Sequence, residues 1–309
     1  MKDLCIISTC YNEELNVREC YESIKKIMLK NNMDYEHVFS DNCSNDNTVK
    51  ILEDICKNDS NVKLLVNSKN YGPFLNNFNA LKFANAKYVL INYASDMQDP
   101  PVVIIDMYNK IIKGFDAIFA IKKNTADNFA LKNLRRLFYF ILKKCSDTYL
   151  PMNVNEFILV RRELTDTLIK THDYFPYIRG YIGRLTDNHD CVYFERLGRK
   201  HGKSSNSFLD LYSQAMNGLI FTMNKSIRVF GIVSLLAAFV SMLVLLSSIL
   251  LKIFTPEIAP RGVTMLICLV TLFFSISSCT LTLVLEYMLS IHSQIRGNVE
   301  VRIKDKKNF

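Results

Sequence analysis

Acidic and amide side chains gather in three short segments of this 309-residue sequence: YNEE at 11–14, DNCSND at 41–46 and SDMQD at 95–99. Each segment follows an apolar run of strand-like composition. Carboxylate and amide oxygens are ligands for hard divalent cations, and they also hydrogen-bond the hydroxyls of a polyol. If the three runs are strands of one sheet, the segments meet at one rim and form a site for a metal ion and a polyol.

The elements that must position these segments are visible in the first 120 residues, where β-rich runs alternate with helical patterns. Candidate strands cover 4–8, 37–40, 62–66, 88–92 and 117–121, and helical patterns lie near 15–30, 46–57, 74–85 and 101–113. This alternation predicts an α/β fold with a mainly parallel sheet covered on both faces. Ligands of such sheets bind beyond the carboxyl ends of the strands.

Two long apolar runs stand near the C-terminus. Residues 229–251 and 263–285 contain no charged side chain, and each is long enough to cross a hydrocarbon core of about 30 Å as a helix. The linker between them is short and contains two prolines and a glycine. We therefore expect a two-helix transmembrane hairpin. A pair of buried core helices is the alternative, although uncharged runs of this length are uncommon in soluble cores.

Basic residues flank the two runs. They are Lys225, Arg228, Arg296, Arg302, Lys304, Lys306 and Lys307. The positive-inside tendency places both ends of the hairpin in the cytoplasm. We expect a multi-pass protein of the cell (inner) membrane with a cytoplasmic catalytic domain. The nine cysteines include no CxxC pair, which agrees with reduced thiols, and the formal charge of +8 suits anionic lipid and phosphates.

The chain thus divides into four predicted parts. A catalytic domain covers 1–206, an amphipathic interfacial region 207–228, the hairpin 229–285 and a cytoplasmic basic tail 286–309. An interfacial helix just before the first span would fix the catalytic domain against the bilayer. Residues 127–150 are also basic and amphipathic, and they either lie against a membrane or form an ordinary surface helix.

The polar segments resemble the N-terminal signatures of family 2 glycosyltransferases of the GT-A fold. The matching stretches are STCYNEELNV at 8–17, SDNCSNDNT at 40–48 and YASDMQDPP at 93–101. The chain is most similar to the polyprenyl phosphate glycosyltransferases, the group that includes dolichol phosphate mannose synthase and bacterial enzymes with two C-terminal membrane spans. The likeness continues through NEFILVRREL at 155–164, YIRGYIG at 177–183, YFERLGRKHGKS at 193–204 and LEYM at 285–288. It implies a GT-A catalytic domain followed by the hairpin.

The resemblance implies a metal site in the third segment. Asp96 stands where the family has the second acidic residue of its DxD motif, and Gln98 lies next on the same side of a short loop. Both offer oxygen ligands to Mg²⁺ or Mn²⁺, which would stabilise a leaving diphosphate. Ala94 replaces the first aspartate, so the donor diphosphate itself would hold much of the ion. Asp96 or Asp99 could instead cap the following helix.

The resemblance also implies nucleotide-sugar contacts from all three segments. The matched residues are Tyr11, Asn12, Glu14, Asp41 and Asp96. Tyr11 would stack near the base, and Asp41 would contact the base or ribose. Asn42 replaces the second acidic residue of the family's DDGS pattern. A preference for uracil follows from the resemblance alone, and Asn12 is also a helix-capping residue type.

On the acceptor side, Glu156 matches the acidic residue that related enzymes place beside the acceptor, while Ile158 replaces an arginine frequent there. Glu156 is the candidate catalytic base or acceptor-orienting group. Asp96 is the other candidate catalytic residue. A structural ion pair is the alternative for Glu156. The candidates for binding phosphate or acceptor are Arg179, Arg196, Arg199, Lys203 and Ser204. Arginine grips phosphate at two points, although the stretch around Arg196 could also be a solvated basic face.

These residues imply an inverting transfer. A phosphate monoester has a second pKa of about 6, so at neutral pH its oxygen can attack the anomeric carbon opposite the leaving diphosphate. The expected partners are a nucleotide diphosphate sugar (a UDP-sugar), polyprenyl phosphate and the membrane. The sequence is also compatible with a homo-oligomer. No nucleic-acid module accompanies the basic residues, so no nucleic-acid partner is expected. The product would be a lipid-linked monosaccharide for a cell-envelope glycan or glycoconjugate. The alternatives are transfer to a lipid-linked saccharide or polymer, and a catalytically silent membrane scaffold.

Overall fold

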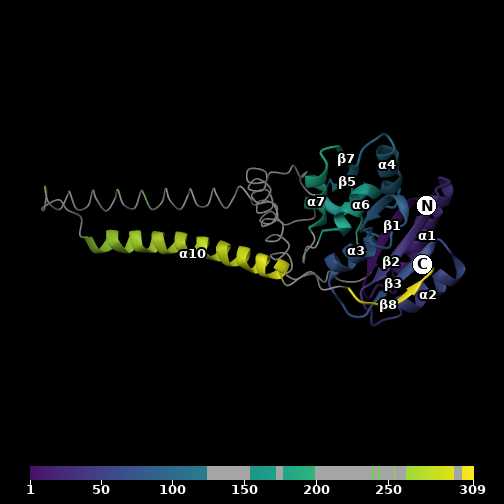
Figure 1. Cartoon of the computed structure of the whole chain (residues 1–309), viewed down its shortest axis with the longest axis horizontal. Coiled ribbons are helices and arrows are strands. Elements are labelled where there is room, and N and C mark those ends of the chain that lie inside the picture. Colours follow the sequence, from purple (N-terminus) through teal and green to yellow (C-terminus); the bar gives the residue numbers. More distant parts are fainter. Residues whose placement is uncertain are drawn as a thin grey trace.

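The computed structural model describes residues 1–123, 154–171, 177–198, 262–295 and 301–309, together with Phe239, Leu243 and Phe254. Within these residues an eight-stranded sheet has the order β7-β5-β6-β4-β1-β2-β3-β8 (Figure 1). The strands are β1 Lys2–Cys10, β2 Tyr35–Asp41, β3 Val62–Asn67, β4 Ala86–Ile91, β5 Ala117–Lys122, β6 Val154–Arg161, β7 His189–Phe194 and β8 Ile303–Lys307. Only β6 and β8 run against the common direction of the other strands in this sheet.

Helices cover both faces of the sheet. One face carries α1 Val17–Lys30, α2 Thr48–Asn58 and α4 Val102–Ile111, and the other carries α3 Pro73–Leu81, α6 Arg162–Ile169 and α7 Ile178–Leu185. Successive residues of a strand point to opposite faces. Leu4 and Ile6 of β1 accordingly pack in the first layer, and Cys5 and Ile7 pack in the second. The predicted α/β fold with a mainly parallel, doubly covered sheet is confirmed.

All five predicted strands and all four predicted helical patterns of the first 120 residues are present, with ends that differ by a few residues. The sequence patterns do not indicate β6, β7 or β8. β6 inserts antiparallel between β4 and β5, and β8 pairs antiparallel with the edge of β3. The predicted basic tail therefore contains a strand of the catalytic sheet.

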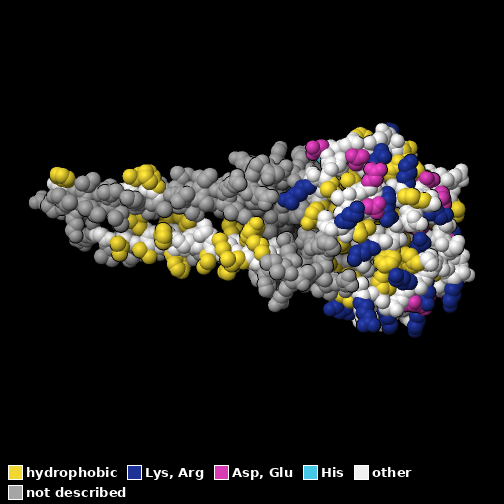
Figure 2. Space-filling model, in the orientation of Figure 1, with side chains coloured by type: hydrophobic (Ala, Val, Ile, Leu, Met, Phe, Trp, Pro, Cys, Tyr) yellow, Lys and Arg dark blue, Asp and Glu magenta, His cyan; other side chains and the backbone are white. Residues whose placement is uncertain are grey.

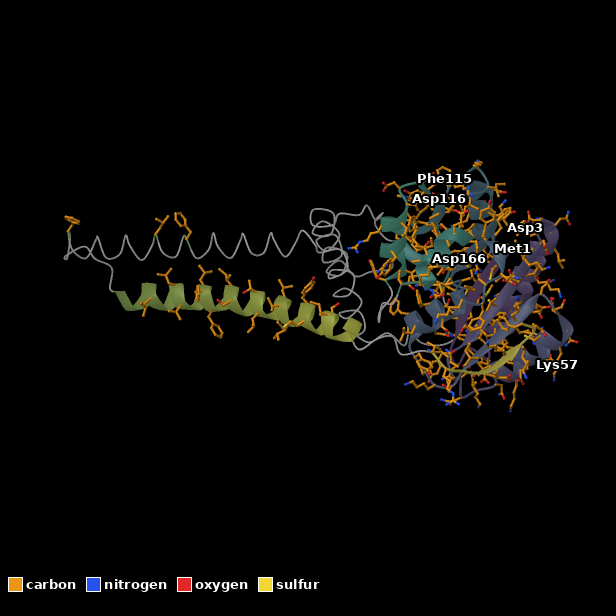
Figure 3. All side chains as sticks on the ribbon, in the orientation of Figure 1. Met1, Asp3, Lys57, Phe115, Asp116 and Asp166 are labelled. Atoms are coloured by element: carbon orange, nitrogen blue, oxygen red, sulfur yellow. The ribbon has the colours of Figure 1, made fainter. Side chains whose placement is uncertain are left out.

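Polar contacts fix β6 from the end of the sheet that lies away from the polar loops. Asp116 lies just before the amino end of β5, next to Phe115 (Figure 3). It accepts a hydrogen bond from Thr186 Oγ1 at 2.9 Å and pairs with Arg161 of β6 at 3.2 Å. Arg161 Nε also donates to the carbonyl oxygen of Phe115 at 2.9 Å. These contacts hold β6, the strand that carries Glu156, in register.

α10, Gly262–Ile295, projects away from the sheet and carries apolar side chains along its length (Figures 1 and 2). Judged on the described residues alone, no helix is long and apolar enough to be assigned as a membrane-crossing segment. The second predicted span, 263–285, falls within α10. The first predicted span, 229–251, lies outside the described residues, apart from Phe239 and Leu243. The predicted amphipathic segments 127–150 and 207–228 lie entirely outside them.

Candidate active site

The loops that follow β1 and β2 are tied together by hydrogen bonds. Asn12 N donates to Ser44 Oγ at 2.9 Å, and Asn12 Oδ1 accepts a hydrogen bond from Asn45 N at 2.8 Å. Glu14 Oε2 accepts bonds from the backbone and side-chain nitrogens of Asn47 at 3.0 and 2.9 Å. The structure thus brings the first two polar segments together. Asn12 and Glu14 shape these loops, and neither caps α1, whose N-cap residue is Asn16.

The loop after β4 joins the same edge of the sheet. Thr9 Oγ1 donates to Asn92 Oδ1 at 3.1 Å, and Ser95 Oγ donates to the carbonyl oxygen of Thr9 at 3.1 Å. The third polar segment therefore lies beside the end of β1. As the strand order requires, all three segments share one rim.

Asp41 is the last residue of β2, Asn42 follows it, and both side chains are buried. Asp41 Oδ2 accepts a hydrogen bond from Ser44 N at 2.9 Å, and Asp41 Oδ1 accepts one from Ser44 Oγ. Burial raises the pKa of Asp41, and the bonds from Ser44 oppose that rise. Asn42 Oδ1 accepts bonds from Tyr71 N at 3.0 Å and Asn67 Nδ2 at 3.3 Å. Asn42, which replaces an acidic residue of the family pattern, thus joins the loop after β2 to the loop after β3.

Asp96 is 6% exposed and shapes the loop before α4. Its Oδ1 accepts a hydrogen bond from Gln98 N at 3.2 Å, a contact two residues along the chain and not a cap on α4. The carbonyl oxygen of Gln98 accepts a bond from Leu197 N at 2.8 Å. This bond draws the segment after β7, which contains Arg196, to the rim.

Asp99 is 1% exposed, and neither of its carboxylate oxygens has a hydrogen-bond partner among the described residues. Arg196 Nε lies 3.9 Å from Asp99 Oδ1. Burial raises the pKa of Asp99, Lys122 and Arg196 oppose the rise, and Asp96 adds to it. Asp99 does not cap α4 through its side chain. A buried carboxylate without a hydrogen bond, next to a second carboxylate, fits a site that receives a cation.

No group of three or more His, Cys, Asp or Glu residues in the described part of the chain is arranged to hold a metal ion. The fit to a divalent cation therefore rests on Asp96 and Asp99, with Gln98 beside them. Further oxygen ligands would have to come from a bound diphosphate.

Glu156 lies at the same edge of the sheet. In the register of β6 with β4, Ile158 pairs with Ile91, so Glu156 stands two residues beyond the carboxyl end of β4. Its side chain is 8% exposed, and Oε1 has no hydrogen-bond partner in the described part of the chain. Burial raises the pKa of Glu156 to about 7, while Arg179 and Asn77 oppose the rise. A carboxyl with this pKa can accept or give up a proton near neutral pH.

Arg179 of α7 lies near enough to Glu156 to favour its ionised form. Its Nη1 donates to the carbonyl oxygen of Val154 at 2.9 Å, and its guanidinium stands 4.7 Å from the ring centre of Tyr177. Tyr11 is 41% exposed on the rim. The other candidates, Arg199, Lys203 and Ser204, lie outside the described residues.

The structure adds a residue that the sequence did not indicate. Asn77 of α3 is 1% exposed, and neither its Nδ2 nor its Oδ1 has a hydrogen-bond partner among the described residues. It lies beside Glu156 without forming a bond of good geometry. Buried amides without partners are uncommon and costly, so Asn77 and Glu156 fit a site where a polar ligand supplies hydrogen bonds. Asparagine within a helix gives no such signal in a sequence.

Several known proteins are similar to this chain. Residues 5–169 match the family model described as "Glycosyl transferase family 2". The "Uncharacterized glycosyltransferase YkcC" of Bacillus subtilis is 25% identical over 292 residues, 94% of this chain and 90% of that protein. The "Undecaprenyl-phosphate 4-deoxy-4-formamido-L-arabinose transferase" of Proteus mirabilis is 23% identical over 297 residues, again 94% and 90% of the two chains. The "Bactoprenol glucosyl transferase" of Shigella phage SfV is 24% identical over 241 residues, 78% of each chain.

Among solved structures, glucosyl-3-phosphoglycerate synthase from Mycobacterium tuberculosis, crystallised with Mn²⁺, UDP and phosphoglyceric acid, aligns with a TM-score of 0.52. The two share 14% identity over 71% of this chain and 77% of that one, so the likeness concerns the fold. The fold is an α/β fold of the GT-A-like class. The chain belongs to glycosyl transferase family 2, and it is a glycosyltransferase.

Proposed function

We propose that this glycosyltransferase moves a sugar, with inversion, from a UDP-sugar to polyprenyl phosphate at the cytoplasmic face of a membrane. The observation that carries the proposal is the common rim. Loops after β1, β2 and β4 gather there, and Glu156 lies at the same edge with its burial-raised pKa. The relatives from Proteus mirabilis and Shigella phage SfV have names that specify a sugar and an undecaprenyl phosphate or bactoprenol.

The donor would lie over the first three loops. Tyr11 would stack on the base, Asp41 would contact the base or ribose, and the loops that Asn12 and Glu14 hold together would form the floor. Asp96, with Gln98 and Asp99 nearby, would hold Mg²⁺ or Mn²⁺ against the diphosphate. When bound, such an ion stabilises the negative charge that develops on the leaving diphosphate.

The acceptor phosphate would enter beside Glu156 and Asn77. Its oxygen attacks the anomeric carbon, and the bond from that carbon to the diphosphate breaks on the opposite side. Phosphate and Glu156 titrate close together, with pKa values of about 6 and about 7, so the carboxylate can take a proton from a monoanionic acceptor. Arg179 would balance the charge. Arg196, with Arg199, Lys203 and Ser204 further along the chain, would bind phosphate.

The membrane part of the proposal rests on the two uncharged runs and on α10. α3 and α7, which carry Asn77 and Arg179, lie at the end of the domain from which α10 projects (Figure 1). A hairpin over 229–251 and 263–285 would therefore hold this end of the rim at the level of the lipid headgroups.

Incubation of the full chain with a panel of radiolabelled nucleotide sugars and polyprenyl phosphate tests this function. The proposal predicts that label from one UDP-sugar moves into the organic-soluble fraction only when polyprenyl phosphate is present. Transfer that instead requires a lipid-linked saccharide would replace the proposed acceptor. Label released as free sugar at the same rate with or without lipid would contradict transfer to lipid.

A further inference from the structure

The C-terminal residues 301–309 lie against β3, on the half of the sheet whose loops would bind the nucleotide. β8 pairs antiparallel with β3, with Lys307 opposite Leu64 and Asp305 opposite Val66. Figure 1 places β8 and the C-terminus against the domain, although α10 extends far from it. Without β8, β3 would be an edge strand with unpaired backbone groups. Basic side chains gather along this edge in Figure 2, which suits the sequence IKDKK of β8.

Contacts at the end of the chain fasten this strand. Asn308 Nδ2 donates to the carbonyl oxygens of Cys56 at 2.7 Å and Val62 at 2.8 Å. The rings of Phe309 and Phe83 meet edge to face at 5.4 Å. The two hydrogen bonds of Asn308 span 252 and 246 residues of sequence, and together with the ring contact they position β8 from its C-terminal side.

Contacts at the other end of β8 reach the loop after β3. Ser68 N donates to the carbonyl oxygen of Arg302 at 2.9 Å, and Arg302 N donates to Tyr71 Oη at 3.0 Å. The hydroxyls of Ser68 and Tyr71 lie 3.2 Å apart. The Tyr71 hydroxyl is therefore held by the backbone of a residue that follows the predicted membrane hairpin.

The same loop continues to the end of β2. Tyr71 N donates to Asn42 Oδ1 at 3.0 Å, and Asn42 Nδ2 donates to Asn70 Oδ1 at 2.8 Å. Gly72, whose φ is +81°, donates its N–H to Asn70 Oδ1 at 2.8 Å. Asn42 directly follows Asp41, the proposed base or ribose contact. An unbroken series of hydrogen bonds thus runs from Arg302 to the donor rim.

We propose that the C-terminal strand positions the donor site: Arg302 holds Tyr71, Tyr71 holds the Ser68–Gly72 loop against Asn42, and high-affinity nucleotide binding requires this connection. The inference rests on the proposed function for the identity of the nucleotide. Tyr71 and Arg302 are positioning residues, because the contacts described join them to protein groups. The arrangement makes donor affinity depend on the correct return of the chain from α10.

The test uses the full chain with Tyr71→Phe, which removes only the hydroxyl that bonds Arg302 and Ser68. The matched control is Tyr193→Phe, since Tyr193 is 60% exposed on β7 at the opposite edge of the sheet. We expect the Kd for UDP to rise about fivefold to tenfold, the scale of one or two lost hydrogen bonds. The KM for polyprenyl phosphate should stay unchanged, and the Tm should fall by no more than about 2–4 °C, the scale of the same lost bonds. An unchanged Kd for UDP would overturn the inference.

A second variant ends the chain after Val301, and a synthetic peptide of residues 302–309 is added in trans. UDP binding should be lost and then restored by the peptide, but not by a scrambled peptide. Full UDP affinity without the peptide would overturn the inference, as would failure of the peptide to restore binding to a folded truncated chain. If that chain does not fold, Tyr71→Phe decides. If the wild type binds none of UDP, GDP, CDP and dTDP, the proposed function fails instead.

Discussion

Glu156→Gln replaces a carboxyl group by an amide of nearly the same volume. The fold opposes ionisation of this carboxyl, because it is buried. Burial raises the pKa of Glu156 from 4.5 to about 7. The folded state therefore binds this proton more tightly than the unfolded state does. The contribution of Glu156 to the free energy of unfolding is therefore greatest below about pH 4.5 and is lost as pH rises through about 7. The full cost is of the order of 3 kcal/mol, at 1.36 kcal/mol per pKa unit.

Linkage between pKa values of 4.5 and about 7 predicts that Glu156 removes about 2 kcal/mol of stability between about pH 5.5 and about pH 8. In Glu156→Gln this loss is absent. Asp41 and Asp99, whose pKa values are raised by burial, and His37, whose pKa burial lowers to about 3, titrate in both proteins. The difference between the two proteins therefore isolates Glu156.

Urea unfolding of the detergent-solubilised full chain, followed by far-ultraviolet circular dichroism, measures this difference. The variant should gain about 2 kcal/mol relative to wild type between the two pH values. The transfer rate of the wild type should rise with pH through about 7, as the carboxylate forms, and the variant should lose both the rate and this rise. Parallel stability curves for the two proteins would refute the reasoning about burial. A variant with full activity would remove Glu156 from the acceptor side.

Three further substitutions test other parts of the rim. Asp96→Asn should lower kcat by about 100-fold or more without changing Tm, because an amide is a poorer ligand for a hard cation; near-normal turnover, or full wild-type activity in a chelator, would remove Asp96 from the metal site. Arg196→Ala should raise the KM for donor or acceptor about tenfold, the scale of one charged hydrogen bond; identical KM values for both substrates would leave it a surface residue. At about pH 5, where Glu156 is protonated, Asn77→Leu should raise the free energy of unfolding by about 1 kcal/mol, because it removes a buried amide without hydrogen bonds, yet at neutral pH it should lower transfer; a stabilised variant with unchanged kcat/KM for polyprenyl phosphate would show that Asn77 does not contact the acceptor.

The sequence was sufficient for the parallel core of the sheet because its signals are local. Each strand from β1 to β5 is an apolar run, and each polar loop follows such a run, so strand order alone brings the loops to one rim. β8 carries no such signal. Its sequence, IKDKK, is charged, and only the unpaired edge of β3 makes it a strand. The sequence of residues 286–309 therefore predicts a basic tail and not a strand.

A site residue can be predicted when its type and its position after a strand are enough to assign its role. It cannot be predicted when its role depends on which other loop it contacts. Asp41, Asp96 and Glu156 lie on the predicted rim, but the roles of Asn12 and Glu14 in joining two loops follow only from their hydrogen bonds. The polar loops alone suggest that a chain ending near Asn224 keeps nucleotide binding. Loss of β8 gives a physical reason to expect the opposite, because the edge of β3 and the support for Tyr71 would both go.

Mass spectrometry of the lipid product tests the central claim most directly. The full chain is incubated with the UDP-sugar selected from the panel and with polyprenyl phosphate, and the organic extract is analysed. Polyprenyl phosphate should gain the mass of one sugar residue, joined through its phosphate, and one UDP should be released for each lipid formed. Polyprenyl phosphate of unchanged mass alongside free sugar and UDP, or a sugar found only on a lipid-linked saccharide, would contradict it.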